Sequence, residues 1–147
     1  MDTRKLNILL ADDDTDDCNF FKEALEDLKL PVHLTTVRDG EQLMELLTKD
    51  SKELPDVLFL DINMPRKNGH ECLAEIKHNK KLKGLSVVMF STSNSPDKIQ
   101  MTFKSGAHIY IHKPGDFSQL KEVIRHALPI ATGGSTLNKH VKYILNA

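Results

Sequence analysis

Short apolar runs alternate with longer amphipathic stretches along most of this chain. The runs are Leu6–Ala11, Val32–Val37, Val57–Asp61, Ser86–Ser91 and His108–His112. Most are rich in Val, Ile, Leu or Phe and lack clean alternation, which is typical of parallel strands that are buried on both faces. We therefore predict five strands in the core of a parallel sheet.

The stretches between the runs have the spacing of helices. Apolar residues recur three or four positions apart, so each group falls on one helical face. The groups are Phe20, Phe21, Ala24, Leu25 and Leu28; Leu43, Leu46 and Leu47; Cys72, Leu73 and Ile76; Ile99 and Phe103; and Phe117, Leu120, Ile124 and Leu128. Repeated alternation of strand and helix predicts a doubly wound α/β fold with right-handed crossovers.

The C-terminal end has a different pattern. The linker-like sequence Thr-Gly-Gly-Ser at 132–135 detaches a short tail, so we divide the chain into a domain over 5–128 and a tail over 129–147. A helix capped by Ser135 or Thr136 would have its apolar residues on one face. Those residues are Leu137, Val141, Ile144 and Leu145. A helix this short is unstable alone, so we expect the tail to dock on its own domain or on a second copy.

Composition narrows the functional classes. The chain has 147 residues, a formal net charge of −1 and 28% charged residues, so no global field favours nucleic acid or an anionic membrane. The apolar runs are too short to span a bilayer, and the N-terminus lacks a signal-peptide pattern. Cys18 and Cys72 lie in helix-like segments, which indicates reduced thiols and a cytoplasmic protein.

Chemically useful side chains follow the predicted strands. Asp12 and Asp13 come after the first strand, Asp61 ends the third, Ser91 ends the fourth and Lys113 follows the fifth. Sites in open α/β sheets form at the carboxyl ends of the strands. If these strands are neighbours, carboxylates, a hydroxyl and an ammonium group converge on one crevice.

Such a crevice suits phosphoryl transfer. Clustered carboxylates repel one another, and Mg²⁺ is a cation that binds through one or two carboxylates together with a phosphate group. Lys113 would supply a second positive charge. A metal ion and a lysine beside a carboxylate nucleophile would let Asp61 attack phosphorus while the charge on the phosphoryl oxygens is stabilised.

Plainer interpretations remain for each residue. Asp14, Asp16 and Asp17 fit the N-terminus of a helix, Asp61 fits a turn, and Lys113 fits a solvated loop. Two other motifs fail. An EF-hand loop starting at Asp12 would need Gly where Asp17 stands. The Asp-x-Asp-x-Thr/Val motif of haloacid-dehalogenase-type phosphatases fails at its fifth position, Asp16.

Four blocks in order resemble the receiver domain of two-component response regulators. They are Asp12-Asp13 after an apolar strand, Leu60–Pro65 followed by Gly69, Ser91-Thr92, and Lys113-Pro114. The resemblance covers roughly residues 5–128. The longer regions before the second and third strands, and the Pro-Arg-Lys-Asn-Gly turn, are similar to the single-domain subgroup that includes phytochrome-associated regulators.

The resemblance implies a flavodoxin-like sheet of strand order 2-1-3-4-5 and a set of roles. Asp61 would be the phosphoacceptor, Ser91 and Lys113 would contact the phosphoryl group, and Tyr110 would be the aromatic switch residue. The implied ligands of Mg²⁺ are Asp13, Asp61, the backbone carbonyl of Asn63 and, through water, Asp12. The bond between Lys113 and Pro114 would be cis.

The resemblance also implies partners. A histidine kinase or histidine phosphotransfer protein would donate the phosphoryl group, and output would be protein–protein contact or onward transfer, with a homodimer left open. The chain would not be an enzyme in the ordinary sense, although it would assist its own phosphorylation and dephosphorylation. Two alternatives are a receiver-fold interaction module that is not phosphorylated and a flavin-binding protein. The Asp triplet at 12–14 argues against flavin because it would repel the flavin phosphate.

Overall fold

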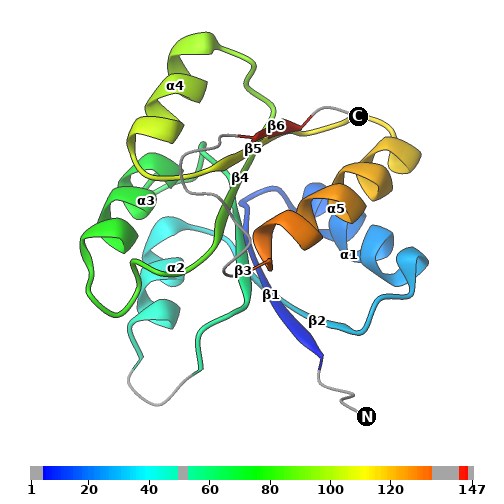
Figure 1. Ribbon diagram of the computed structural model, residues 1–147, viewed down its shortest axis with the longest axis horizontal. Helices are drawn as coiled ribbons and strands as arrows, with labels where there is room; N and C mark the ends of the chain where they lie inside the picture. Colours follow the sequence, from blue (N-terminus) through cyan, green and yellow to red (C-terminus); the bar gives the residue numbers. More distant parts are fainter. Residues whose placement is uncertain (1–4, 50–52, 134–142, 146–147) are drawn as a thin grey trace.

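The computed structural model describes residues 5–49, 53–133 and 143–145, and its elements are shown in Figure 1. The strands are β1 (Leu6–Ala11), β2 (Val32–Val37), β3 (Val57–Leu60), β4 (Val87–Ser91), β5 (Ile109–His112) and β6 (Tyr143–Leu145). The helices are α1 (Thr15–Leu28), α2 (Gly40–Leu47), α3 (Gly69–His78), α4 (Pro96–Lys104) and α5 (Phe117–Ala131). The strands form one sheet in the order β2-β1-β3-β4-β5-β6, and every neighbouring pair is parallel. The predicted α/β class and the order of the first five strands are therefore confirmed.

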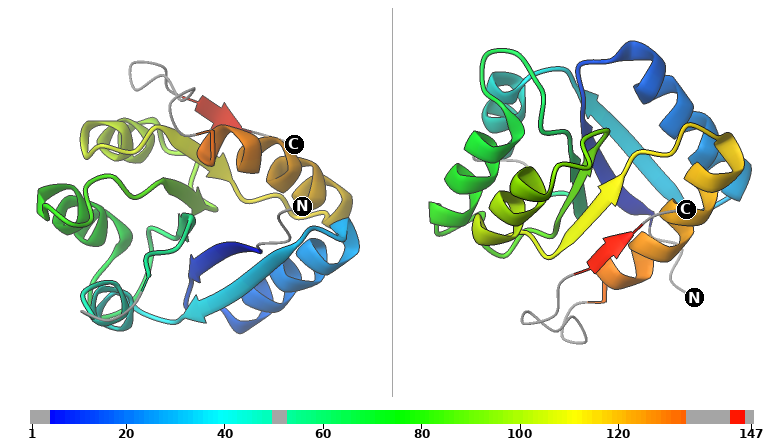
Figure 2. Two further views of the ribbon diagram at one scale, coloured as in Figure 1. Left: turned by 60° about the horizontal axis from the view of Figure 1, so that its bottom comes forward. Right: turned by 90° about the horizontal axis from the view of Figure 1, so that it is seen from above.

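Helices cover both faces of the sheet (Figure 2). Successive residues of a strand point to opposite faces, so Leu9 and Leu10 belong to two separate apolar clusters. The cluster with Leu10 packs against α1 and α5, and the cluster with Leu9 packs against α2, α3 and α4. This burial on both faces explains why β3 and β4 read as continuous apolar runs. The strand β2 lies at the edge of the sheet and is only partly buried, so the expectation of a strand buried on both faces is wrong there.

The predicted C-terminal helix is wrong for residues 143–145, because they form β6 on the outer edge of β5. The register runs from Ile109 beside Tyr143 to Ile111 beside Leu145. Strand pairing satisfies the N–H and C=O groups that β5 would otherwise leave open. A run of three apolar residues is too short for its spacing to distinguish a helix from a strand. These residues dock on their own domain, as one alternative expected, whereas Leu137 and Val141 lie outside the described residues.

Two further observations complete the fold. The division of the chain at residue 128 stays a prediction, and α5 continues to Ala131. Over the ranges 5–49, 53–133 and 143–145, no helix combines the length and hydropathy needed to cross a membrane.

Candidate functional site at the carboxyl ends of the strands

The structure brings the predicted site residues together at one edge of the sheet. Asp12, Asp61 and Lys113 follow β1, β3 and β5 directly, and Ser91 is the last residue of β4. These four strands are neighbours, so their carboxyl ends meet. Asp12, Asp61 and Ser91 are buried, and Asp13 is exposed.

Three carboxylates form a compact acidic group. Asp12, Asp13 and Asp61 each offer an oxygen atom, and these atoms lie within 4.8 Å of one another. Burial raises the pKa of Asp61 to about 6; the nearby charge of Asp12 adds to this effect, and Lys113 opposes it. Burial also raises the pKa of Asp12. The group is therefore costly to ionise, and a cation bound to it would relieve that cost.

Lys113 is the positive charge that the structure places in this crevice. Its Nζ atom lies 2.6 Å from Asp12 Oδ2, 3.0 Å from Asp17 Oδ2 and 3.5 Å from Asp61 Oδ2. Burial alone would lower the pKa of Lys113, but the surrounding carboxylates raise it well above its ordinary value. The ammonium group therefore stays charged. Sequence reasoning placed Asp17 only at a helix N-terminus and missed this contact.

The loop after β4 is held by β5 at three successive carbonyl groups. The carbonyls of Ser91, Thr92 and Ser93 accept hydrogen bonds from β5 and the residue after it. The donors are, in that order, the Lys113 amide at 2.8 Å, His112 Nε2 at 3.0 Å and the Tyr110 hydroxyl at 2.5 Å. Sequence reasoning gave His112 no role. The loop follows β4, which is the neighbour of β3, so it lies on one side of Asp61. By holding this loop, β5 fixes the position of that side of the crevice.

The loop after β3 approaches Asp61 from the other side. The backbone N–H of Asn63 donates a hydrogen bond to the Asp61 carboxylate, which lowers the pKa of that group. Gly69 begins α3 directly against the backbone of Asp61, where an added Cβ would lie 2.2 Å from the Asp61 carbonyl oxygen. This position therefore needs glycine. No peptide bond in the described ranges is cis, so the predicted cis bond before Pro114 is wrong; the bond has the trans geometry that X–Pro bonds adopt by default.

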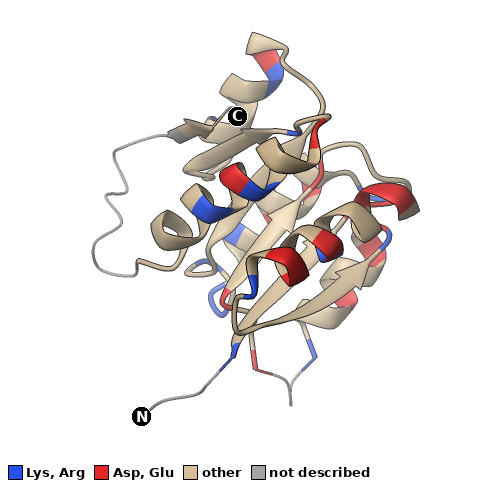
Figure 3. Ribbon diagram, turned by 90° about the vertical axis from the view of Figure 1, so that its right-hand side faces the viewer, with Lys and Arg blue, Asp and Glu red and all other residues tan. Residues whose placement is uncertain are grey.

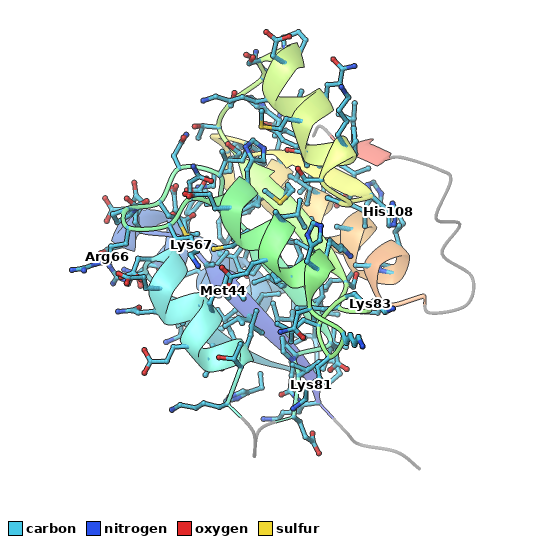
Figure 4. The ribbon with its side chains drawn as sticks, turned by 90° about the vertical axis from the view of Figure 1, so that its left-hand side faces the viewer. Met44, Arg66, Lys67, Lys81, Lys83 and His108 are labelled. Atoms are coloured by element: carbon cyan, nitrogen blue, oxygen red, sulfur yellow. The ribbon has the colours of Figure 1, made fainter. Side chains whose placement is uncertain are left out.

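Two further basic residues lie at this end of the molecule. Figure 4 labels Arg66 and Lys67 at the end opposite Lys81 and Lys83. Arg66 Nε lies 3.6 Å from Asp39 Oδ2, and Lys67 pairs with Glu75. Their charges are therefore engaged by acidic residues outside the acidic group.

Known proteins match this arrangement over most of the chain. The family model of the response regulator receiver domain matches residues 8–125. Response regulator Rcp1 of Synechocystis sp. is 30% identical over 122 residues, covering 80% of this chain and 83% of that protein.

Solved structures agree with the sequence match. The crystal structure of the phosphorylated cyanobacterial phytochrome response regulator RcpA has a TM-score of 0.80 at 32% identity and covers 89% of this chain and 96% of that chain. The Mn²⁺-bound form of Rcp1 has a TM-score of 0.76 at 29% identity, with coverage of 84% and 92%. The chain belongs to the family of response regulator receiver domains.

Proposed function

We propose that this receiver domain accepts a phosphoryl group on Asp61, with Mg²⁺ bound at the acidic group and Lys113 as the fixed positive charge. The observation that carries the proposal is the convergence of Asp12, Asp13 and Asp61 within 4.8 Å, with Lys113 Nζ 3.5 Å from Asp61. Asp61 is the nucleophile because it lies at the centre of the crevice, at the end of β3 between β1 and β4.

The donor set suits a hard divalent cation. Carboxylate and carbonyl oxygens are the ligands that Mg²⁺ takes in proteins, usually together with phosphate oxygens. Asp13, Asp61 and the backbone carbonyl of Asn63 would bind it directly, and Asp12 would act through water. When bound, the cation would neutralise charge on the phosphoryl oxygens.

The protein groups then have defined parts in the transfer. A carboxylate oxygen of Asp61 attacks phosphorus; the P–O bond forms while the P–N bond of a phosphohistidine donor breaks. The electron pair of that bond returns to the donor imidazole, which takes up a proton. Lys113 stabilises the phosphoryl charge. Ser91 Oγ accepts a bond from the Ser93 amide and its side chain also hydrogen-bonds Tyr110; on phosphorylation its hydroxyl would donate to a phosphoryl oxygen.

The biological setting follows from the same chemistry. The donor is a histidine kinase or a histidine phosphotransfer protein in the cytoplasm, and the two buried free thiols, Cys18 and Cys72, suit that compartment. Phosphorylation shifts the population of the loop after β4 and of Tyr110, which changes protein–protein contacts or permits onward transfer.

Labelling with a small phosphodonor tests the acceptor. Incubation with acetyl phosphate and Mg²⁺ should add one phosphoryl group to the wild-type chain by intact mass. Asp61→Asn should add none, and Asp97→Asn, which removes an exposed carboxylate in the first turn of α4, should be labelled like the wild type. Equal labelling of wild type and Asp61→Asn would refute the assignment. No labelling of the wild type by acetyl phosphate or phosphoramidate would favour an interaction module that is not phosphorylated.

The metal is tested separately by stability. Millimolar Mg²⁺ should raise the melting temperature of the wild type, because a ligand of the native state stabilises it. Asp13→Ala should lose most of that rise, whereas Asp16→Ala, with the same loss of charge outside the acidic group, should keep it. A wild-type melting temperature that ignores Mg²⁺ would contradict the metal site.

A further inference from the structure

The Lys113 ammonium group is shared unequally among three carboxylates. It donates hydrogen bonds to Asp12 Oδ2 at 2.6 Å and to Asp17 Oδ2 at 3.0 Å. Asp61 Oδ2 is more distant, at 3.5 Å. In this state the ammonium group is therefore hydrogen-bonded to Asp12 and Asp17, and it lies within ion-pair distance of the acceptor without a hydrogen bond to it.

The position of Asp17 is fixed by the packing of α1 against α5. Figure 3 shows these two helices side by side, with acidic residues on α1 and both basic and acidic residues on α5. Two contacts join the helices: Phe20 with Phe117, at 5.3 Å between ring centroids, and Asp27 with Lys121, at 2.6 Å. Asp17 of α1 contacts Lys113, which directly follows β5, at 3.0 Å. Positions three or four apart share a helical face. Asp17 therefore lies on the same face of α1 as Phe20, the face that packs against α5, and from there its side chain contacts Lys113.

The neighbouring Asp16 provides the contrast. Both residues lie in the acidic first turn of α1, so both carry the same charge at the same end of the helix. Asp16 is exposed, whereas the side chain of Asp17 is 38% exposed and contacts Lys113. Asp17 also lies close enough to Asp12 for its charge to raise the pKa of that carboxyl.

The geometry points to Asp17 as a positioning residue for Lys113: its carboxylate holds the ammonium group beside Asp12 and thereby limits how much of the Lys113 charge reaches a phosphoryl group on Asp61. This inference rests on the proposed phosphoacceptor function. A phosphoryl group on Asp61 competes with Asp17 for the same ammonium group, so Asp17 opposes the phosphorylated state. Replacing Asp17 by a neutral residue of the same shape should favour that state.

Binding of beryllium fluoride with saturating Mg²⁺ measures this competition, because beryllium fluoride mimics a phosphoryl group on a carboxylate. The full chain is compared with Asp17→Asn and Asp16→Asn. Asp17→Asn should bind beryllium fluoride about threefold to fivefold more tightly, the range that a partly exposed ion pair supplies. Asp16→Asn should change the affinity by less than about 1.5-fold, because exposed charges without a direct contact are screened. Equal effects of the two variants, or weaker binding by Asp17→Asn, would overturn the inference.

A second readout does not depend on phosphoryl chemistry. In protein with ¹³C-labelled lysine, the Lys113 side-chain resonance is identified by its loss in Lys113→Gln. Without Mg²⁺ or beryllium fluoride, this resonance should shift in Asp17→Asn and stay in place in Asp16→Asn. An unmoved resonance in Asp17→Asn would overturn the inference even if binding changed. Failure of the wild type to bind beryllium fluoride would instead count against the proposed function, while the resonance would still decide whether Asp17 positions Lys113.

Discussion

The hydroxyl of Tyr110 donates a 2.5 Å hydrogen bond to the backbone carbonyl of Ser93. Tyr110 is completely buried in β5, and the amide of Ser93 donates to Ser91 Oγ at 3.2 Å. The Tyr110 and Ser91 side chains are also hydrogen-bonded to each other. A change at Ser91 therefore reaches Tyr110 both directly and through Ser93.

Tyr110→Phe tests this connection, because it keeps the ring and removes the donor. The Ser93 carbonyl loses its partner, so the free energy of unfolding should fall by about 1 kcal/mol. Amide hydrogen exchange of the loop after β4 should accelerate, whereas the Mg²⁺-dependent rise in melting temperature should persist because the carboxylates are untouched. Unchanged exchange in the loop would show that the bond does not restrain it.

Asp61→Asn should change stability in a pH-dependent way in the absence of metal. Burial raises the pKa of Asp61 to about 6, above the value of about 3.9 in an unfolded chain. The folded state therefore binds the proton more tightly, and wild-type stability falls as pH rises from about 4 to about 6. The neutral amide avoids this loss, so the variant should be more stable by roughly 3 kcal/mol at pH 7.5, with no gain near pH 4.

Urea unfolding in EDTA at these two pH values measures the difference. Asp97→Asn, which alters an exposed carboxylate, should show no comparable gain. If Asp61→Asn were less stable than the wild type at pH 7.5, the ionised Asp61 carboxylate would not destabilise the folded state.

Gly69→Ala should damage the site through the backbone. The new Cβ would lie 2.2 Å from the Asp61 carbonyl oxygen, so either α3 or the Asp61 backbone must move. Overpacking of this kind costs about 1–3 kcal/mol, and we also expect a weaker Mg²⁺ response. Gly84→Ala is the matched control, because nothing lies within 4 Å of its added Cβ; its stability should stay within about 0.5 kcal/mol of the wild type. Equal stabilities of the two variants would contradict the close approach.

The docking of β6 can be tested with two adjacent residues. Leu145 packs against the apolar cluster that contains Leu10, whereas the Ile144 side chain is 52% exposed. Leu145→Ala should lower the free energy of unfolding by about 1–2 kcal/mol because it removes partly buried apolar surface. Ile144→Ala should cost less than about 0.5 kcal/mol. The opposite ranking in urea unfolding would show that the strand does not pack in this register.

Buried parallel strands are the part of this fold that sequence predicts well. The run Val57–Leu60 is apolar at every position because helices cover both of its faces. The same logic located the site, since residues that follow neighbouring parallel strands share an edge of the sheet. The sequence did not predict β6, because three residues are too few to show the periodicity of a strand. Its partner strand, β5, begins at Ile109, which is distant in the sequence.

The missed site residues depend on tertiary packing. Asp17 contacts Lys113 across a long separation in sequence, because the packing of α1 against α5 brings the start of α1 beside the residue that follows β5. His112 bonds Thr92 only because the loop after β4 passes over the end of β5. Neither relationship leaves a local signal in composition or spacing. By contrast, the caps at Asp14 and Asp39 are local, and in both the side chain accepts from the backbone three residues on.

The pairing of β6 with β5 also bears on how copies of this protein behave at high concentration. An open strand edge is a template on which another chain can add, and long apolar edges promote aggregation. Residues Ile109–Ile111 of β5 would present such an edge, but β6 occupies it. Among the described residues, Tyr143–Leu145 thus cover this edge of the sheet. Removal of these residues should expose the β5 edge and lower the concentration at which the protein precipitates.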